Sequence, residues 1–265
     1  MNRQGLLFAG LSALVAALFL ASLLTGPAGI GPGESLAALF RGGDDLLALV
    51  MRELRLPRAI LGLMVGAALG MAGAVLQGFL RNPLAEPGLI GTSASAALGA
   101  VLAIQTGLSA AFPLGLPLAA LAGAALSVLL VLMLAGPRGG TLALILAGIA
   151  ISALAGAATS LVLNLSPNPF AINEIVFWMM GSLADRSMLH VWIAAPFMLL
   201  GFALLWPMRP ALEALTLGED AAASSGVHLG RLRLMLVAGI AALIGGATAV
   251  AGTVGFVGLV VPHVL

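Results

Sequence analysis

The sequence predicts an all-α protein that crosses a membrane several times. Of its 265 residues, 61% are hydrophobic and only 8% are charged, and the charges are confined to short segments between long apolar stretches. A soluble domain carries roughly 25% charged residues, so this chain has too few to cover the surface of a water-soluble globule. The composition excludes a cytosolic enzyme, a nucleic-acid-binding protein and a disordered chain, and a lipid bilayer is the solvent that fits it.

Seven stretches are apolar over about the 20 residues that a helix needs to cross a bilayer. Periodicity says little within them, because a lipid-embedded helix is apolar on all sides, so Pro, Gly and charged residues mark the boundaries. An eighth stretch begins at Val257 and runs to Leu265. The seven predicted spans are residues 6–25, 59–79, 89–107, 113–135, 141–164, 189–206 and 232–253.

The first span begins like a secretory signal peptide, with one Arg before the apolar run. It is longer than a typical signal core, and no small-residue cleavage site precedes polar sequence, so we expect a retained helix. Arginines divide almost evenly between the two sides and do not fix the orientation by themselves. Four arginines and four acids share the segment 27–58, which reads as a folded cap, and this favours an N-terminus on the inside.

Small residues occupy every fourth position of the second span. Positions four apart lie on one side of a helix, and a ridge of small side chains lets a neighbouring membrane helix approach closely. Chance is the alternative explanation in a chain with 35 glycines. We call this set the small-residue ridge and predict that it packs tightly against another helix; its members are Gly62, Gly66, Gly70, Ala74 and Gly78.

The apolar stretches lack the groups that ion-coupled transport or membrane catalysis needs. No Asp, Glu or Lys lies deep inside a predicted span, the chain has no Cys, and His190, His228 and His263 are scattered. Proton and ion pathways use intramembrane ionisable residues, and metal sites use clustered ligands. We expect no catalytic residue, metal site or cofactor. A pore-forming subunit driven by an external motor fits best, and an ion-coupled secondary transporter is a weaker alternative.

Four groups of motifs follow one another in a specific order along the chain. The first enters the second span as RLPR at 55–58, continues as GAALGMAG at 66–73 and leaves as RNPLAEPGLIG at 81–91. The others are WMMGSL at 178–183, LTLGE at 215–219 and GFVGLVVPH at 255–263. Together they closely resemble the permease family of bacterial ABC importers for ferric siderophores, haem and cobalamin.

The resemblance implies the ten-helix fold of a type II importer permease in the bacterial inner membrane. It further implies a homodimer, a periplasmic substrate-binding protein, two cytoplasmic ATPase subunits and no nucleic acid. Members of the family are longer than this chain, so residues 1–265 hold about seven helices and the start of an eighth, in a single permease domain incomplete at its C-terminus. The alternative is a truncated fragment that does not transport. Ferric siderophore ranks first as substrate, then haem, then cobalamin.

The family also assigns roles to particular positions of this sequence. Arg55 and Arg58, at the end of the periplasmic loop 27–58, would dock the binding protein; anchoring at lipid headgroups is the alternative. Gly139, Gly140 and Thr141 would line the cytoplasmic gate; an ordinary helix cap is the alternative. Residues 211–229 would form two cytoplasmic coupling helices that break at Gly218, end at Gly226 and fit a groove on the ATPase. The residues that carry this coupling are Leu215, Leu217, Gly218 and Glu219.

Overall fold

The protein is described by a computed structural model that covers residues 3–26, 29, 31–40, 45–136 and 139–264. Regular structure in these ranges is entirely helical. The chain forms two compact units, one of residues 1–63 and 183–192 and the other of residues 64–182 and 193–265. Within the predicted loop 27–58, residues 27–28, 30 and 41–44 lie outside the described part of the chain.

The first unit contains α1 (Arg3–Leu24), α2 (Pro32–Phe40), α3 (Leu46–Leu49), the π-helical turn η1 (Val50–Arg55) and the beginning of α4 (Leu56–Leu80). A small apolar core of Leu23, Ala38 and Met51 joins α1, α2 and η1. Asp45 begins α3 by accepting a hydrogen bond from the Leu47 amide, as an N-cap does.

The predicted second span starts too late, because residues 46–80 form one helical run of 35 residues. Its charged residues and Pro57 make the first turns look like a loop in the sequence. The π-helical turn η1 ends two residues before Pro57. Its wider hydrogen-bond spacing lets the helix continue through Pro57, which has no backbone N–H to donate. Part of the segment 27–58 is therefore a helix continuous with the span.

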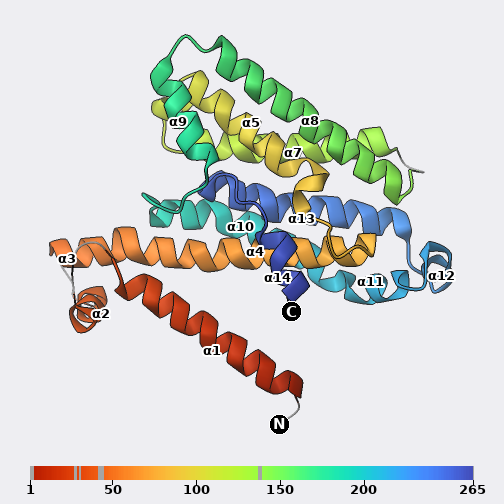
Figure 1. The fold of residues 1–265 in the computed structure, drawn as a ribbon, viewed down its shortest axis with the longest axis horizontal. Coiled ribbons are helices and arrows are strands. Elements are labelled where there is room, and N and C mark those ends of the chain that lie inside the picture. The colour runs from red at the N-terminus through yellow and green to blue at the C-terminus, as the bar shows by residue number, and fades with distance from the viewer. Residues whose placement is uncertain (1–2, 27–28, 30, 41–44, 137–138, 265) are drawn as a thin grey trace. The chain divides into compact units, whose positions relative to one another are not determined.

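The second unit is built mainly from long helices, and Figure 1 shows α5, α7 and α8 lying together in it. Among the described residues, six helices are long and apolar enough to cross a membrane. The long helices of this unit are α7 (Gly115–Ala135), α8 (Thr141–Leu165), α13 (Leu229–Ala251) and all of α10 (Met188–Leu205) except its first five residues, which belong to the first unit. The shorter ones are η2 (Pro87–Ile90), α5 (Thr92–Gln105), α6 (Leu108–Ala111), α9 (Pro169–Met179), η3 (Trp206–Met208), α11 (Arg209–Leu215), α12 (Glu219–Ser224) and α14 (Val257–Val264).

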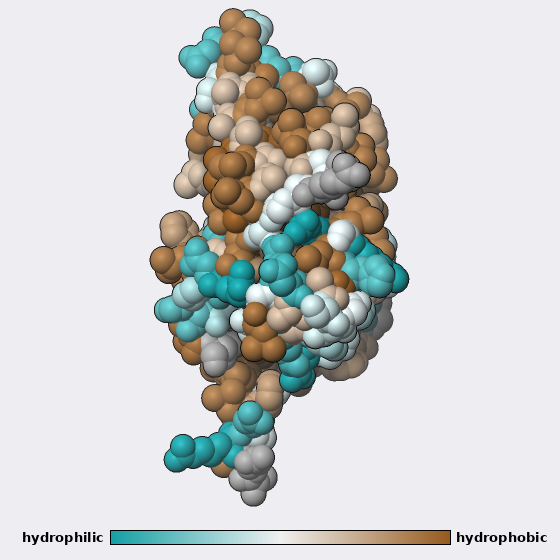
Figure 2. Space-filling view, turned by 90° about the vertical axis from the view of Figure 1, so that its right-hand side faces the viewer, coloured by the Kyte–Doolittle hydropathy of each residue, from teal (hydrophilic) through white to brown (hydrophobic). Residues whose placement is uncertain are grey.

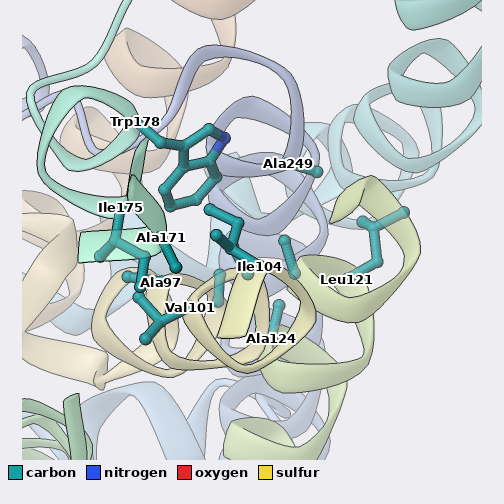
Figure 3. Packing of buried hydrophobic residues seen from close by; sticks show 12 residues of the cluster. Ala97, Val101, Ile104, Leu121, Ala124, Ala171, Ile175, Trp178 and Ala249 are labelled. Carbon is teal, nitrogen blue, oxygen red and sulfur yellow. The ribbon is translucent and has the colours of Figure 1, made fainter. Parts of the chain in front are cut away.

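Two helices of this unit differ from the prediction. The predicted third span, 89–107, contains only the 14 residues of α5, about 21 Å of helix at 1.5 Å per residue. Helix α9 occupies a segment that the sequence marked as a connection. Its residues Ala171, Ile175 and Trp178 point into a core formed with α5, α7 and α13 (Figure 3). Their spacing of three and four residues is that of one helix face.

Close packing in the second unit depends on glycines at helix crossings. A Cβ added to Gly99 of α5 would collide with the carbonyl of Ala119, and one added to Gly123 of α7 would collide with that of Ser95. The hydroxyls of Ser127 and Thr92 lie 3.3 Å apart in the same helix pair. Small-xxx-small spacing is therefore the feature that seats α5 on α7.

The small-residue ridge of α4 makes no such approach to another backbone among the described residues. An added Cβ at its glycines would meet at most a side-chain atom, at 3.5 Å or more, and Ala74 is exposed. The close contact of α4 is made instead by Gly73, where a Cβ would collide with the carbonyl of Gly258. Packing through the ridge stays a prediction, because spacing shows where a helix can approach but not which helix does.

Candidate functional site

The predicted pair of short helices with a break at Gly218 is confirmed by α11 and α12 (Figure 1). Gly218 has φ +110°, a backbone conformation that favours glycine. Gly226 ends α12 with φ +89°. Its amide donates to the Ala223 carbonyl and the next amide donates to Ala222, the hydrogen-bond pattern of a Schellman C-cap. The turn and the cap both follow from glycines that the sequence singled out.

The two leucines assigned to coupling lie in opposite environments. Leu215 is buried at the end of α11, with 2% of its surface exposed, whereas Leu217 is 81% exposed at the break between the helices. Figure 2 looks at this end of the unit and shows polar residues gathered among apolar ones. Leu217 is therefore one of the large apolar side chains that this unit exposes.

The sequence places Glu219 where its carboxylate could accept from the free amides of the second short helix, but it makes no such capping hydrogen bond to α12. One carboxylate oxygen accepts a hydrogen bond from the Thr141 hydroxyl at the first residue of α8. The other lies 3.0 Å from Nη2 of Arg233 in α13. The structure therefore brings Thr141, from the predicted gate, into contact with Glu219, from the predicted coupling element.

Arg233 is a member of this cluster that sequence reasoning missed. Its Nη1 donates to the carbonyl of Gly139, two residues before α8 begins. Gly140 is the N-cap residue of α8 and is exposed. In the sequence, Arg233 is one of two arginines at the start of an apolar helix, so the only available signal was a charge at the edge of a span. We call Gly139, Thr141, Glu219 and Arg233 the polar cluster.

Arg55 and Arg58, both of which the resemblance assigned to docking, have different environments. The Arg55 side chain is 7% exposed, and its Nη1 donates to the carbonyl of Leu24 at the end of α1 and to the hydroxyl of Ser35. It satisfies a helix C-terminus, where carbonyls lack partners within the helix. The guanidinium of Arg55 is therefore not on the surface, whereas Arg58 is exposed.

The RNPLAEPGLIG motif forms the turn between α4 and α5. The Gln77 amide donates to the carbonyls of Ala85 in this turn and Leu259 in α14, so it ties the turn to the last motif. Glu86 caps η2 by accepting from the Gly88 amide at 3.2 Å. Burial raises the pKa of Glu86 above its ordinary value, and the Gly88 hydrogen bond opposes that rise.

A cavity of about 800 Å³ opens beside this turn in the second unit. Glu86 and Thr253 are among the residues that line it, together with apolar residues such as Leu69 and Ile244. The small polar face of α8 supplies Ser152, Gly156 and Ser160. The lining thus combines hydroxyl-bearing and apolar residues with one acidic residue.

The WMMGSL motif packs directly against the end of α13. Gly181 and Gly252 have φ +75° and +73°, and a Cβ on Gly252 would collide with the Trp178 carbonyl and lie 3.1 Å from the Cα of Gly181. The Ser182 amide donates to the Ala251 carbonyl at 2.7 Å. Two backbones meet here without side chains between them, which explains why both positions are glycine.

Comparison with known proteins places this arrangement in a family. Residues 14–265 match the FecCD transport family. This chain belongs to the FecCD transport family.

Individual relatives agree with the family match. The chain is 38% identical over 229 residues to the uncharacterized ABC transporter permease protein YvrB of Bacillus subtilis, covering 84% of this chain and 64% of that protein. It is 38% identical over 230 residues to the cobalamin import system permease protein BtuC of Halobacterium salinarum, covering 86% and 61%. It is 36% identical over 255 residues to the vitamin B12 import system permease protein BtuC of Salmonella paratyphi A, covering 96% and 76%.

A solved structure shows the same fold. A metal-chelate type ABC transporter in an inward-facing conformation matches 97% of this chain and 80% of its own, with a TM-score of 0.85 and 31% identity. The FecCD chain thus has the type II permease fold predicted from its motifs and is a multi-pass protein of the plasma membrane. It spans less than two thirds of the first two relatives named above.

Proposed function

We propose that this FecCD chain is the transmembrane subunit of an ATP-driven importer for a metal chelate. The observation that carries the proposal is the family match over residues 14–265, which extends to the polar cluster and to the exposed Leu217. A permease of this kind has no ATPase site of its own. It works as a homodimer, with ATPase subunits below it and a periplasmic binding protein above it.

The α11–α12 element is the contact for the ATPase in this proposal. Leu217 offers an apolar anchor at 81% exposure, and Gly218 sets the angle between the helices. Such an anchor surrounded by polar groups suits a groove on a partner protein. The turn at Gly139, Gly140 and Thr141 forms the cytoplasmic gate beside it, since Thr141 contacts Glu219 directly.

The cavity beside α8 suits the passage of a chelate rather than of a bare ion. Its wall combines Ser152, Gly156 and Ser160 with apolar groups, so it offers weak hydrogen bonds and few charges. A chelate carries the donor atoms that hold its metal, so the cavity wall does not need to supply metal ligands. The names of two relatives favour a corrinoid, and ferric siderophore and haem are the other candidates.

Reconstitution tests the proposed function and its substrate. We expect proteoliposomes with the full-length permease, its ATPase and its binding protein to take up radiolabelled cobalamin or a ferric siderophore only when ATP is inside. A non-hydrolysable ATP analogue serves as the control for nucleotide binding alone. Uptake that persists without ATP and follows a proton or sodium gradient would instead support a secondary transporter.

Arg58 is the proposed docking residue for the binding protein. We expect Arg58→Glu to weaken docking by about tenfold at low salt, because a planar guanidinium pairs well with a carboxylate and a reversed charge repels it. Surface plasmon resonance at two salt concentrations measures this, and the difference should shrink at high salt. Arg209→Glu, an exposed arginine of the α11 end, is the matched control. Equal affinities for Arg58→Glu and the control would rule out docking at Arg58.

A further inference from the structure

Arg233 bonds to both proposed moving parts at once, the gate turn and the coupling element. We propose that the polar cluster is a clamp through which the start of α8 moves together with α12, and that Arg233 is its positioning residue. The proposal rests on the proposed function, because it explains how the coupling element would act on the gate.

The geometry of the guanidinium carries the first step of the argument. Nη2 of Arg233 lies 3.0 Å from the Glu219 carboxylate, and Nη1 donates to the Gly139 carbonyl. The side chains of Arg233 and Glu219 are 15% and 36% exposed, so solvent screens the pair in part, through the carboxylate. Both groups are reached because a guanidinium is a rigid fork of donors, and a lysine ammonium on a flexible stem does not reproduce that geometry.

The second step of the argument is that the two carboxylate oxygens of Glu219 bind different helices. One is held by Arg233 in α13, and the other accepts from the Thr141 hydroxyl. Glu219 is also the first residue of α12. A shift of α12 away from both α8 and α13 therefore breaks two charge-assisted hydrogen bonds, which are stronger than neutral ones. The carboxylate also lies beside the N-terminus of α8, where a negative charge is favourable.

The clamp joins parts of the chain that are far apart in the sequence. Gly139 and Arg233 are 94 residues apart, and Thr141 and Glu219 are 78 apart. A purely structural role for these bonds predicts that removing them lowers stability and leaves the gate responsive to ATP. A clamp predicts that the gate loses its response to ATP in assembled protein.

Gly140→Cys supplies a reporter on the gate turn. The native chain has no cysteine, Gly140 is exposed with φ −74°, and a Cβ there meets nothing within 4 Å. The rate of maleimide labelling of this thiol is measured with and without ATP in the full-length importer in proteoliposomes. Substrate transported per ATP hydrolysed is measured in the same samples.

We expect Arg233→Gln in the Gly140→Cys background to reduce the ATP-dependent change in labelling, and the transport per ATP, by about fivefold or more. Thr141→Val, which removes only the hydroxyl at similar size, should act in the same direction, and Thr141→Ser should restore the response. Arg231→Gln is the matched control, because Arg231 is exposed on the same helix.

An unchanged labelling response in both Arg233→Gln and Thr141→Val would overturn the clamp. So would labelling of Gly140→Cys alone that ignores ATP while uptake remains ATP-driven, because the turn would then not be the gate. The proposed function itself fails only if uptake by the unmodified importer does not require ATP. The two failures are therefore distinguishable in one set of samples.

Discussion

Gly218→Pro is expected to reduce substrate uptake by about tenfold or more in the reconstituted importer. Gly218 has φ +110°, which proline cannot adopt. Its amide also donates to the Leu215 carbonyl at 3.0 Å, and proline has no such donor. The break between α11 and α12 would therefore open at a different angle and displace Leu217 and Glu219 from the proposed ATPase contact.

Glu219→Arg is expected to give a similar loss by a different route. The new guanidinium would face Arg233 at the position where a carboxylate now lies 3.0 Å away, and like charges repel. ATP-driven uptake, transport-coupled ATP hydrolysis and binding-protein docking are measured for both variants, and docking should persist. Gly230→Ala is the control, because a Cβ there meets nothing within 4 Å. Wild-type uptake in both variants would show that residues 211–229 are not the coupling element.

Gly252→Val is expected to destabilise the folded protein by about 2–5 kcal/mol. Two causes add: the backbone has φ +73°, which β-branched residues avoid, and the side chain would enter the space of the Trp178 carbonyl. The WMMGSL turn would have to leave the end of α13, which exposes the buried Trp178. Thermal unfolding in detergent, followed by tryptophan fluorescence and size-exclusion chromatography, measures the loss.

Gly255→Ala is the matched control for that substitution. It lies three residues further along the same connection, and an added Cβ there meets nothing within 4 Å. We expect its unfolding temperature to stay close to that of the native protein. A Gly252→Val protein as stable as Gly255→Ala would mean that the contact between residues 178–181 and 252 is not needed for the fold.

Local features of the sequence were sufficient to predict most helices. Hydropathy located α7, α8 and α13 to within a few residues, and the glycines at 218 and 226 predicted the break and the cap of the α11–α12 pair. The prediction failed where a local signal was ambiguous. Charges and Pro57 hid the first turns of the long helix 46–80, and the short amphipathic α9 has too few apolar residues to resemble a span.

The sequence by itself determined that the protein lies in a lipid bilayer, where its spans approximately are, and which family it belongs to. These conclusions rest on hydropathy and motif order, which can be read from residues close together in the chain. Only the tertiary structure decided which residues act together. It buried Arg55 against the end of α1, placed Gly73 of α4 against the backbone of Gly258, and brought Gly139, Thr141, Glu219 and Arg233 into one polar cluster. The physical reason is that these contacts connect residues tens of positions apart, and spacing along one helix carries no information about which other helix will lie against it.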